Sequence, residues 1–91
     1  MKILRYRIGL AGPGILQLPE RRRFLSAQAR AGEVQSWFLV DPSSRVVPVR
    51  FVVLNTGTDV DDGFALFLEH MATIQLHGSV WHLFEMKEIS K

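Results

Sequence analysis

The sequence predicts a mainly β protein: one small antiparallel sandwich or barrel of six to seven short strands, with room for one short helix near residues 62–71. Three observations predict this fold class. The length of 91 residues allows a single domain, residues 1–91, and leaves no room for a second hydrophobic core. A hydrophobic share of 47% and a charged share of 22% are typical of a globular chain. Short apolar runs separated by Gly and Pro turns are typical of antiparallel strands.

The first strand is predicted over Lys2–Ile8, where apolar and charged side chains follow a two-residue period. The Gly12-Pro13-Gly14 segment then predicts a turn, because Gly permits positive φ and Pro lacks the backbone donor of a strand ladder. A short strand follows over Ile15–Leu18, and Pro19 is expected to end its pairing.

The segment Glu20–Ala31 has two interpretations. Its Arg, Leu, Ala and Gln residues favour a helix, with Gly32 as the residue that ends it. A strand over Phe24–Ala29, followed by an Ala31-Gly32 hairpin turn, fits equally well. Local propensity does not separate these two interpretations at this length.

Two strands are predicted in the middle of the chain. The clearer one is Val34–Val40, which is rich in aromatic and β-branched residues. The turn Asp41–Ser44 follows, since Asp and Ser bond their own backbone and Pro presets φ. The second apolar run is Val46–Leu54, where Pro48 near its start is tolerable on a sheet edge.

The C-terminal third is predicted to contain a loop, a short helix and a hairpin. The loop is Asn55–Gly63, and the hairpin pairs Thr73–Leu76 with Ser79–Lys87 around a His77-Gly78 turn. The helix is indicated by apolar residues at helical spacing after Asp61 and Asp62, which are Phe64, Phe67, Leu68 and Met71.

Composition excludes several classes of protein and site. The absence of Cys excludes disulfides, a thiolate nucleophile and Cys-based zinc sites. No apolar run approaches the length of a membrane span, and charges interrupt Met1–Arg7 too early for a signal peptide, so we expect an intracellular protein. The formal charge of +2 is weak evidence about partners. The cluster Arg21-Arg22-Arg23 is interpreted as a solvated basic turn, with an anion-facing patch as the alternative.

The three histidines are expected to be structural rather than metal ligands. His77 lies at the hairpin tip and should be exposed, whereas His82 shares a strand face with Val80, Phe84 and Met86 and should be partly buried. A five-residue separation across a turn is not a metal-ligand spacing, and a third ligand is missing unless His70 folds back. We therefore predict no metal and no cofactor.

Catalysis is not favoured by the residue pattern. The aspartates of the 59–62 loop share a polar environment that keeps them ionised, and no Gly-x-Ser-x-Gly elbow is present. An enzyme would need the loop around Thr56 to meet His77 or His82 in a pocket. Backbone N–H groups of Asn55-Thr56-Gly57-Thr58 could instead hold a phosphate or carboxylate.

The two tryptophans are expected to be core anchors, with an interface or a base-stacking role as alternatives. A core position for Trp37 predicts that Trp37→Ala costs roughly 3–5 kcal/mol of stability.

Four segments together form a pattern over nearly the full length: Phe24–Gly32, Trp37–Pro42, Thr56–Thr58, and Thr73–Gly78 running into Val80–Glu85. In this pattern the chain resembles a family of small uncharacterised bacteriophage and prophage proteins with a Trp-x-Leu-Val-Asp segment and a C-terminal Gln-Leu-x-Gly…Val-Trp-His-x-Phe-Glu hairpin. Asn55-Thr56-Gly57-Thr58 stands where that family has Gly-Thr-Gly-His. The resemblance implies that Phe24–Ala31 is a strand, and it implies the host bacterial cytoplasm. It brings no activity with it.

These observations favour a non-catalytic binding protein of phage or prophage origin, a counter-defence factor that sequesters or blocks a host component. We expect a host protein, self-association into a homo-oligomer, or a nucleotide signal as its partner, and no membrane. The alternative is a small barrel that binds single-stranded nucleic acid, which would need Trp37, Phe38 or Trp81 on an outer face beside Arg45 and Arg50. The candidate binding residues are Arg45, Arg50, Thr56, Gly57, Thr58, His77, Trp81 and His82.

Overall fold

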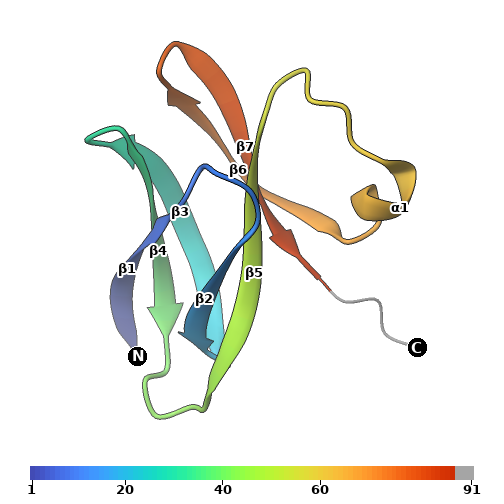
Figure 1. The fold of residues 1–91 in the computed structure, drawn as a ribbon. Helices are drawn as coiled ribbons and strands as arrows, with labels where there is room; N and C mark the ends of the chain where they lie inside the picture. Colours follow the sequence, from blue (N-terminus) through green and yellow to red (C-terminus); the bar gives the residue numbers. More distant parts are fainter. Residues whose placement is uncertain (88–91) are drawn as a thin grey trace.

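The protein is a sandwich of two antiparallel sheets, as a computed structural model that describes residues 1–87 shows (Figure 1). The first sheet has three strands in the order β1 (Lys2–Ile8), β4 (Glu33–Val40) and β3 (Arg22–Arg30). The second has four strands, β2 (Gly14–Pro19), β5 (Val46–Asn55), β7 (Ser79–Met86) and β6 (Leu68–Leu76). The expectation of a mainly β fold with one short helix is confirmed.

Two tight hairpins set the register of the neighbouring strands. Ala31 and Gly32 join β3 to β4 with φ of 51° and 76°, and His77 and Gly78 join β6 to β7 with φ of 53° and 75°. Two consecutive residues in the left-handed region give a turn whose twist matches that of paired strands. The first of these hairpins resolves the two interpretations of residues 20–31 in favour of a strand.

The core lies between the inner faces of the two sheets and is centred on Phe38 of β4. The rings of Phe24, Tyr6 and Phe51 meet the Phe38 ring edge-on, at centroid distances of 5.4, 5.8 and 6.1 Å. Edge-to-face packing of this kind adds to the stabilisation from burial alone. Beside Phe38 the buried Ser36 hydroxyl donates a hydrogen bond to the Tyr6 carbonyl at 2.8 Å, so this polar group is satisfied.

Trp37 does not belong to this core, and the expectation that it does is wrong. Burial along β4 alternates strictly, with Val34, Ser36, Phe38 and Val40 buried and the residues between them half-buried. Successive side chains of a strand point to opposite faces, so Trp37 lies on the outer face of the three-stranded sheet. Phe38 takes the core position that the sequence interpretation gave to its neighbour.

The predicted helix near residues 62–71 is present but much shorter. Helix α1 spans Asp62–Ala65, and Asp61 caps it by accepting hydrogen bonds from the N–H groups of Gly63 and Phe64 at 3.0 and 3.2 Å. Leu68 onward belongs to β6, where Leu68 pairs with Met86. Cross-strand pairing with β7 therefore overrides the local helical spacing of the apolar residues. Within the described residues, no helix is long and apolar enough to cross a membrane.

Pro48 lies within β5, which has neighbours on both sides. The described pairing of β5 with β7 begins only at Arg50, whereas Pro48 pairs with Gln17 of β2 on the other side. The proline therefore occupies a part of the strand where one side carries no described ladder. This position explains how a residue without a backbone N–H is accommodated.

Candidate functional site

The outer face of the three-stranded sheet brings arginines from β1 and β3 to the two sides of Trp37. In the strand register Trp37 lies opposite Arg5 of β1 and Ser26 of β3. Residues directly opposite each other in an antiparallel pair share a face. The neighbouring pairs place Arg7 and Arg23 on this same face, opposite Gln35 and Leu39. The half-buried Trp37 ring thus lies on the outer surface between two strands that each supply arginines.

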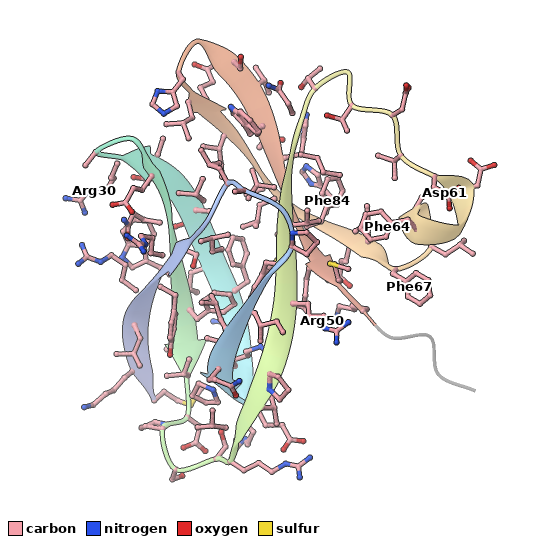
Figure 2. The ribbon with its side chains drawn as sticks, viewed as in Figure 1. Arg30, Arg50, Asp61, Phe64, Phe67 and Phe84 are labelled. Atoms are coloured by element: carbon pink, nitrogen blue, oxygen red, sulfur yellow. The ribbon has the colours of Figure 1, made fainter. Side chains whose placement is uncertain are left out.

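We define the arginine–tryptophan face by Arg5, Arg7, Arg23, Arg30 and Trp37. All four arginines are exposed, and Figure 2 shows Arg30 extending away from the four-stranded sheet. Arg7 pairs with Glu33 at 2.7 Å, while no carboxylate of residues 1–87 lies within ion-pair distance of the other three. With one glutamate the face carries a formal +3, which exceeds the +2 of the whole chain.

The rest of this face is a mixture of apolar and neutral polar side chains. Leu39 pairs with Ile3, which is 63% exposed, and Gln35 pairs with Gln28. Amide side chains both donate and accept hydrogen bonds, and an exposed apolar residue beside an aromatic ring provides a surface for a flat ligand. The face therefore combines cationic, stacking and neutral hydrogen-bonding groups.

The Arg21-Arg22-Arg23 cluster is divided among three environments. Arg21 pairs with Asp41 at 3.0 Å. Arg22 is largely buried at one end of the sandwich, with Glu85 at 3.8 Å and the Pro19 carbonyl at 3.3 Å. Arg23 alone joins the arginine–tryptophan face. The run is therefore neither a solvated turn nor one anion-facing patch, because the strand alternation separates its members.

The arginines predicted from sequence lie elsewhere. Arg45 precedes β5 and pairs with Glu20 at 2.5 Å. Arg50 lies on the outer face of the four-stranded sheet and lines a hollow of about 270 Å³ with Phe64, Phe67, Met86 and Lys87. Figure 2 shows Phe64 projecting from α1 toward that sheet. Neither arginine lies beside a tryptophan on an outer face.

Two histidines and two threonines form a second group on the outer face of the four-stranded sheet. The hydroxyl oxygen of Thr56, which directly follows β5, lies 2.9 Å from His82 Nε2. His82 Nδ1 lies 3.2 Å from His70 Nε2, and Thr73 Oγ1 lies 3.4 Å from each of these two nitrogens. We call these four residues the histidine–threonine cluster. His82 is half-buried, as its strand face predicts, and His70 does face it.

Thr56 and His82 are the two predicted site residues that the structure brings into direct contact. Gly57 follows with φ of 92°, and the N–H of Thr58 donates to the Asn55 carbonyl at 3.1 Å. This turn holds Thr56 over β7, where its own N–H donates to the Val80 carbonyl at 2.9 Å. The hydroxyl–imidazole contact has the length of a nucleophile–base hydrogen bond, but the threonine lies at an open, exposed surface.

His77 and Trp81 lie away from that cluster. His77 is exposed at the tip of the β6–β7 hairpin, and its ring approaches the Gly32 backbone of the other hairpin. Trp81 faces inward, packs against the core and donates its indole N–H to the Leu76 carbonyl at 3.2 Å. The nucleic-acid interpretation requires an aromatic residue on an outer face. Of the two tryptophans, Trp37 lies on such a face and Trp81 does not.

The comparisons with known proteins give a family and no relative of known structure. A family model matches residues 1–91, and its description is Domain of unknown function (DUF7352). No curated protein and no solved structure matches the chain.

Proposed function

The chain belongs to the DUF7352 family, and we propose that it is a non-catalytic binding protein whose arginine–tryptophan face takes a nucleotide unit. The observation that carries this proposal is the position of Trp37 on an outer sheet face, directly opposite Arg5. Arg7 and Arg23 lie opposite the next residues of β4 on that face. The ligand is a base with its phosphate, presented by single-stranded nucleic acid or by a free nucleotide.

An aromatic ring and nearby guanidinium groups match the two chemical parts of a nucleotide. Any of the bases can stack on an aromatic ring, because every base has a π face. Arg forms bidentate hydrogen bonds to phosphate oxygens, which the compact ammonium of Lys cannot do. Open sheet faces with aromatic residues are a common platform for single-stranded nucleic acid. The +3 charge of the face supports an anionic ligand over a neutral one.

The biological setting we propose follows from the resemblance to bacteriophage and prophage proteins. A small protein that captures nucleotide units stoichiometrically needs affinity and no catalytic group. Such a protein, made in the host bacterial cytoplasm, would act as a counter-defence factor by sequestering a nucleotide signal or by covering a single strand. The resemblance supports the setting, and the arginine–tryptophan face supports the ligand class.

Self-association or docking of a host protein is the second candidate, and one feature of β1 favours it. This strand is an edge of its sheet, and it exposes Ile3 to 63% and Leu4 to 37%. An edge strand with exposed apolar side chains can pair with another strand. Native mass spectrometry distinguishes the outcomes: a multiple of 10.4 kDa indicates self-association, and an added mass of a few hundred daltons indicates a captured nucleotide.

The nucleotide proposal is tested by fluorescence anisotropy with a labelled oligothymidylate of about 15 nucleotides, and by competition with ATP and GMP. We expect Trp37→Ala to weaken binding by about 5- to 150-fold, the range of one lost base stack, and Trp37→Phe to retain most of the affinity. We expect Arg5→Gln to weaken binding as well. Arg45→Gln is the matched control, because it removes the same charge from an exposed arginine that lies outside the face.

Salt dependence provides a second readout of the same complex. Three arginines of the face lack a described carboxylate partner, and each phosphate contact on a single strand contributes about 0.7 to the slope of log affinity against log salt. A slope of about −2 is expected, and its magnitude should decrease by about 0.7 in Arg5→Gln. Affinity that does not respond to salt, or equal affinities of wild type and a folded Trp37→Ala variant, would exclude the proposal. Competition by mononucleotides at equal affinity would identify the free nucleotide as the ligand.

A further inference from the structure

We propose that the histidine–threonine cluster binds a divalent transition metal such as Zn²⁺, because it brings two imidazole nitrogens and a threonine hydroxyl within 3.4 Å of one another. Its ligands would be His70 Nε2, His82 Nδ1 and Thr73 Oγ1, with water completing the coordination. The site lies on the outer face of the four-stranded sheet, so it is independent of the nucleotide ligand proposed for the other sheet.

The three ligand atoms form a nearly equilateral triangle. Their separations are 3.2 Å between the two ring nitrogens and 3.4 Å from each nitrogen to the threonine oxygen. A tetrahedral Zn²⁺ with ligands at about 2.0–2.1 Å has ligand atoms about 3.3–3.4 Å apart. One metal ion above this triangle would reach all three atoms once the two imidazoles, whose nitrogens now face each other in a hydrogen bond, tilt toward it.

A β-bulge brings the three ligands to one face. Thr73 pairs with His82 and His70 pairs with Phe84, and the register shifts between His70 and Ala72. Without the extra residue, two positions three apart on a strand would point to opposite faces. The bulge reverses the alternation once, so that His70 and Thr73 flank His82 together. The edge-on contact of the His70 ring with Phe84, at a centroid distance of 5.3 Å, also orients that imidazole.

Thr56 supplies the outer partner that a metal-bound imidazole normally has. When His82 carries its proton on Nε2, that N–H donates to the Thr56 hydroxyl at 2.9 Å, and the lone pair of Nδ1 is directed at His70. A hydrogen bond to the far ring nitrogen fixes the tautomer and ring orientation of a metal ligand. The contact between Thr56 and His82 therefore has a specific role in this proposal.

The site is open and only partly made of strong ligands. His70 and Thr73 are exposed and His82 is half-buried, so a hydrated ion can enter without opening the sandwich. Among residues 1–87 no group of three or more His, Asp or Glu side chains gathers around one point, so two imidazoles would provide most of the affinity. Imidazole suits Zn²⁺, Cu²⁺ and Ni²⁺ better than Mg²⁺ or Ca²⁺.

Isothermal titration of the chelator-treated protein with zinc chloride tests the proposal. We expect one saturable site, with binding at least tenfold weaker in His70→Ala and in His82→Ala, and about 10- to 100-fold weaker in Thr56→Val. His77→Ala is the control, because it removes the exposed hairpin histidine and leaves the cluster intact. The absorption intensity of bound Co²⁺ in the visible range reports the coordination geometry without depending on affinity.

Three results would overturn the proposal. No saturable heat with Zn²⁺ would mean that the two imidazoles form only a hydrogen bond. Unchanged binding in His70→Ala, an exposed position at which the fold should be kept, would place any bound zinc elsewhere. Loss of binding in His77→Ala alone would assign zinc to the hairpin tip.

Discussion

At the scale of single residues, Trp37 and Phe38 are neighbours in the sequence with opposite roles. Phe38 is 1% exposed and meets three other aromatic rings, whereas Trp37 lies on the outer face between β1 and β3. Both residues favour strands and both are large and apolar. Only the packing of the second sheet against β4 determines which of them is covered.

We predict that Phe38→Ala destabilises the fold by about 3–5 kcal/mol, because it removes a fully buried ring and leaves a cavity. Trp37→Ala should cost less than half as much, since its half-buried ring leaves no enclosed cavity. Urea denaturation of both variants measures the two free energies of unfolding. A larger loss for Trp37→Ala than for Phe38→Ala would contradict the assignment of faces.

Asp41 illustrates how one turn affects the response to pH. The Ser43 hydroxyl and the Ser43 N–H both donate to its carboxylate, at 2.6 and 3.0 Å, and Arg21 lies 3.0 Å away. The side-chain hydrogen bond from Ser43, followed by that residue's backbone hydrogen bond and the charge of Arg21, lowers the pKa of Asp41 below 3.8. A lowered pKa in the folded state stabilises the protein above pH 3.8, and this contribution is lost as the pH falls through the lowered value.

We therefore predict that Ser43→Ala raises the pKa of Asp41 toward 3.8. The variant should be less stable than the wild type at neutral pH, and the difference should disappear in strong acid, where Asp41 is protonated in both proteins. An NMR titration of the Asp41 carboxyl carbon measures the pKa directly. A difference in stability that persists unchanged at low pH would show that Ser43 acts through something other than the charged carboxylate.

At the scale of elements, the sequence predicts strands best where alternation and turn residues agree. The hairpins at Ala31-Gly32 and His77-Gly78 lie where their Gly residues indicate a turn. The helix predicted over 62–71 is longer than the observed one, because the spacing of Phe64, Phe67 and Leu68 is equally compatible with a capped helical turn followed by a strand. The β-bulge in β6 leaves no signal in the sequence that we can identify, so the approach of His70 to His82 was not predictable.

The first hairpin supports a prediction about backbone strain. Ala31 has φ of 51°, where a β-carbon is unfavourable and Asn is tolerated through local hydrogen bonding. Ala31→Asn should raise the free energy of unfolding by about 0.5–1 kcal/mol. The matched control is Ala11→Asn, an exposed position without positive φ, which should change stability by less than about 0.5 kcal/mol. Equal effects at both positions would show that turn geometry is not the cause.

At the scale of the whole molecule, composition and turn spacing predict a small antiparallel sandwich, and the structure confirms it. The binding surface could not be predicted in the same way. In β4 each face carries both apolar and polar side chains: Trp37 and Leu39 share a face with Glu33 and Gln35, and Val34, Phe38 and Val40 share the other with Ser36. A large aromatic residue stands on each face, so the size of Trp37 alone does not say that its side is open. The arginines of its face come from β1 and β3, which are separated in the chain by β2. They share one face only because both strands flank β4 in the order β1-β4-β3. Arg45 and Arg50, the arginines predicted from the sequence, lie outside this face.

The central claim is that Trp37, and not Trp81, contacts a nucleotide ligand. The two indole N–H signals in a ¹H–¹⁵N NMR spectrum report on these residues separately within one sample. Trp37 lies on the outer face, whereas Trp81 packs against the core and its indole N–H donates a hydrogen bond to the Leu76 carbonyl. On titration with oligothymidylate, the account predicts a saturating shift of the Trp37 signal, together with the backbone amides of β1 and β3, and a stationary Trp81 signal. A stationary Trp37 signal at saturating oligonucleotide, or a shift of Trp81 alone, would contradict it.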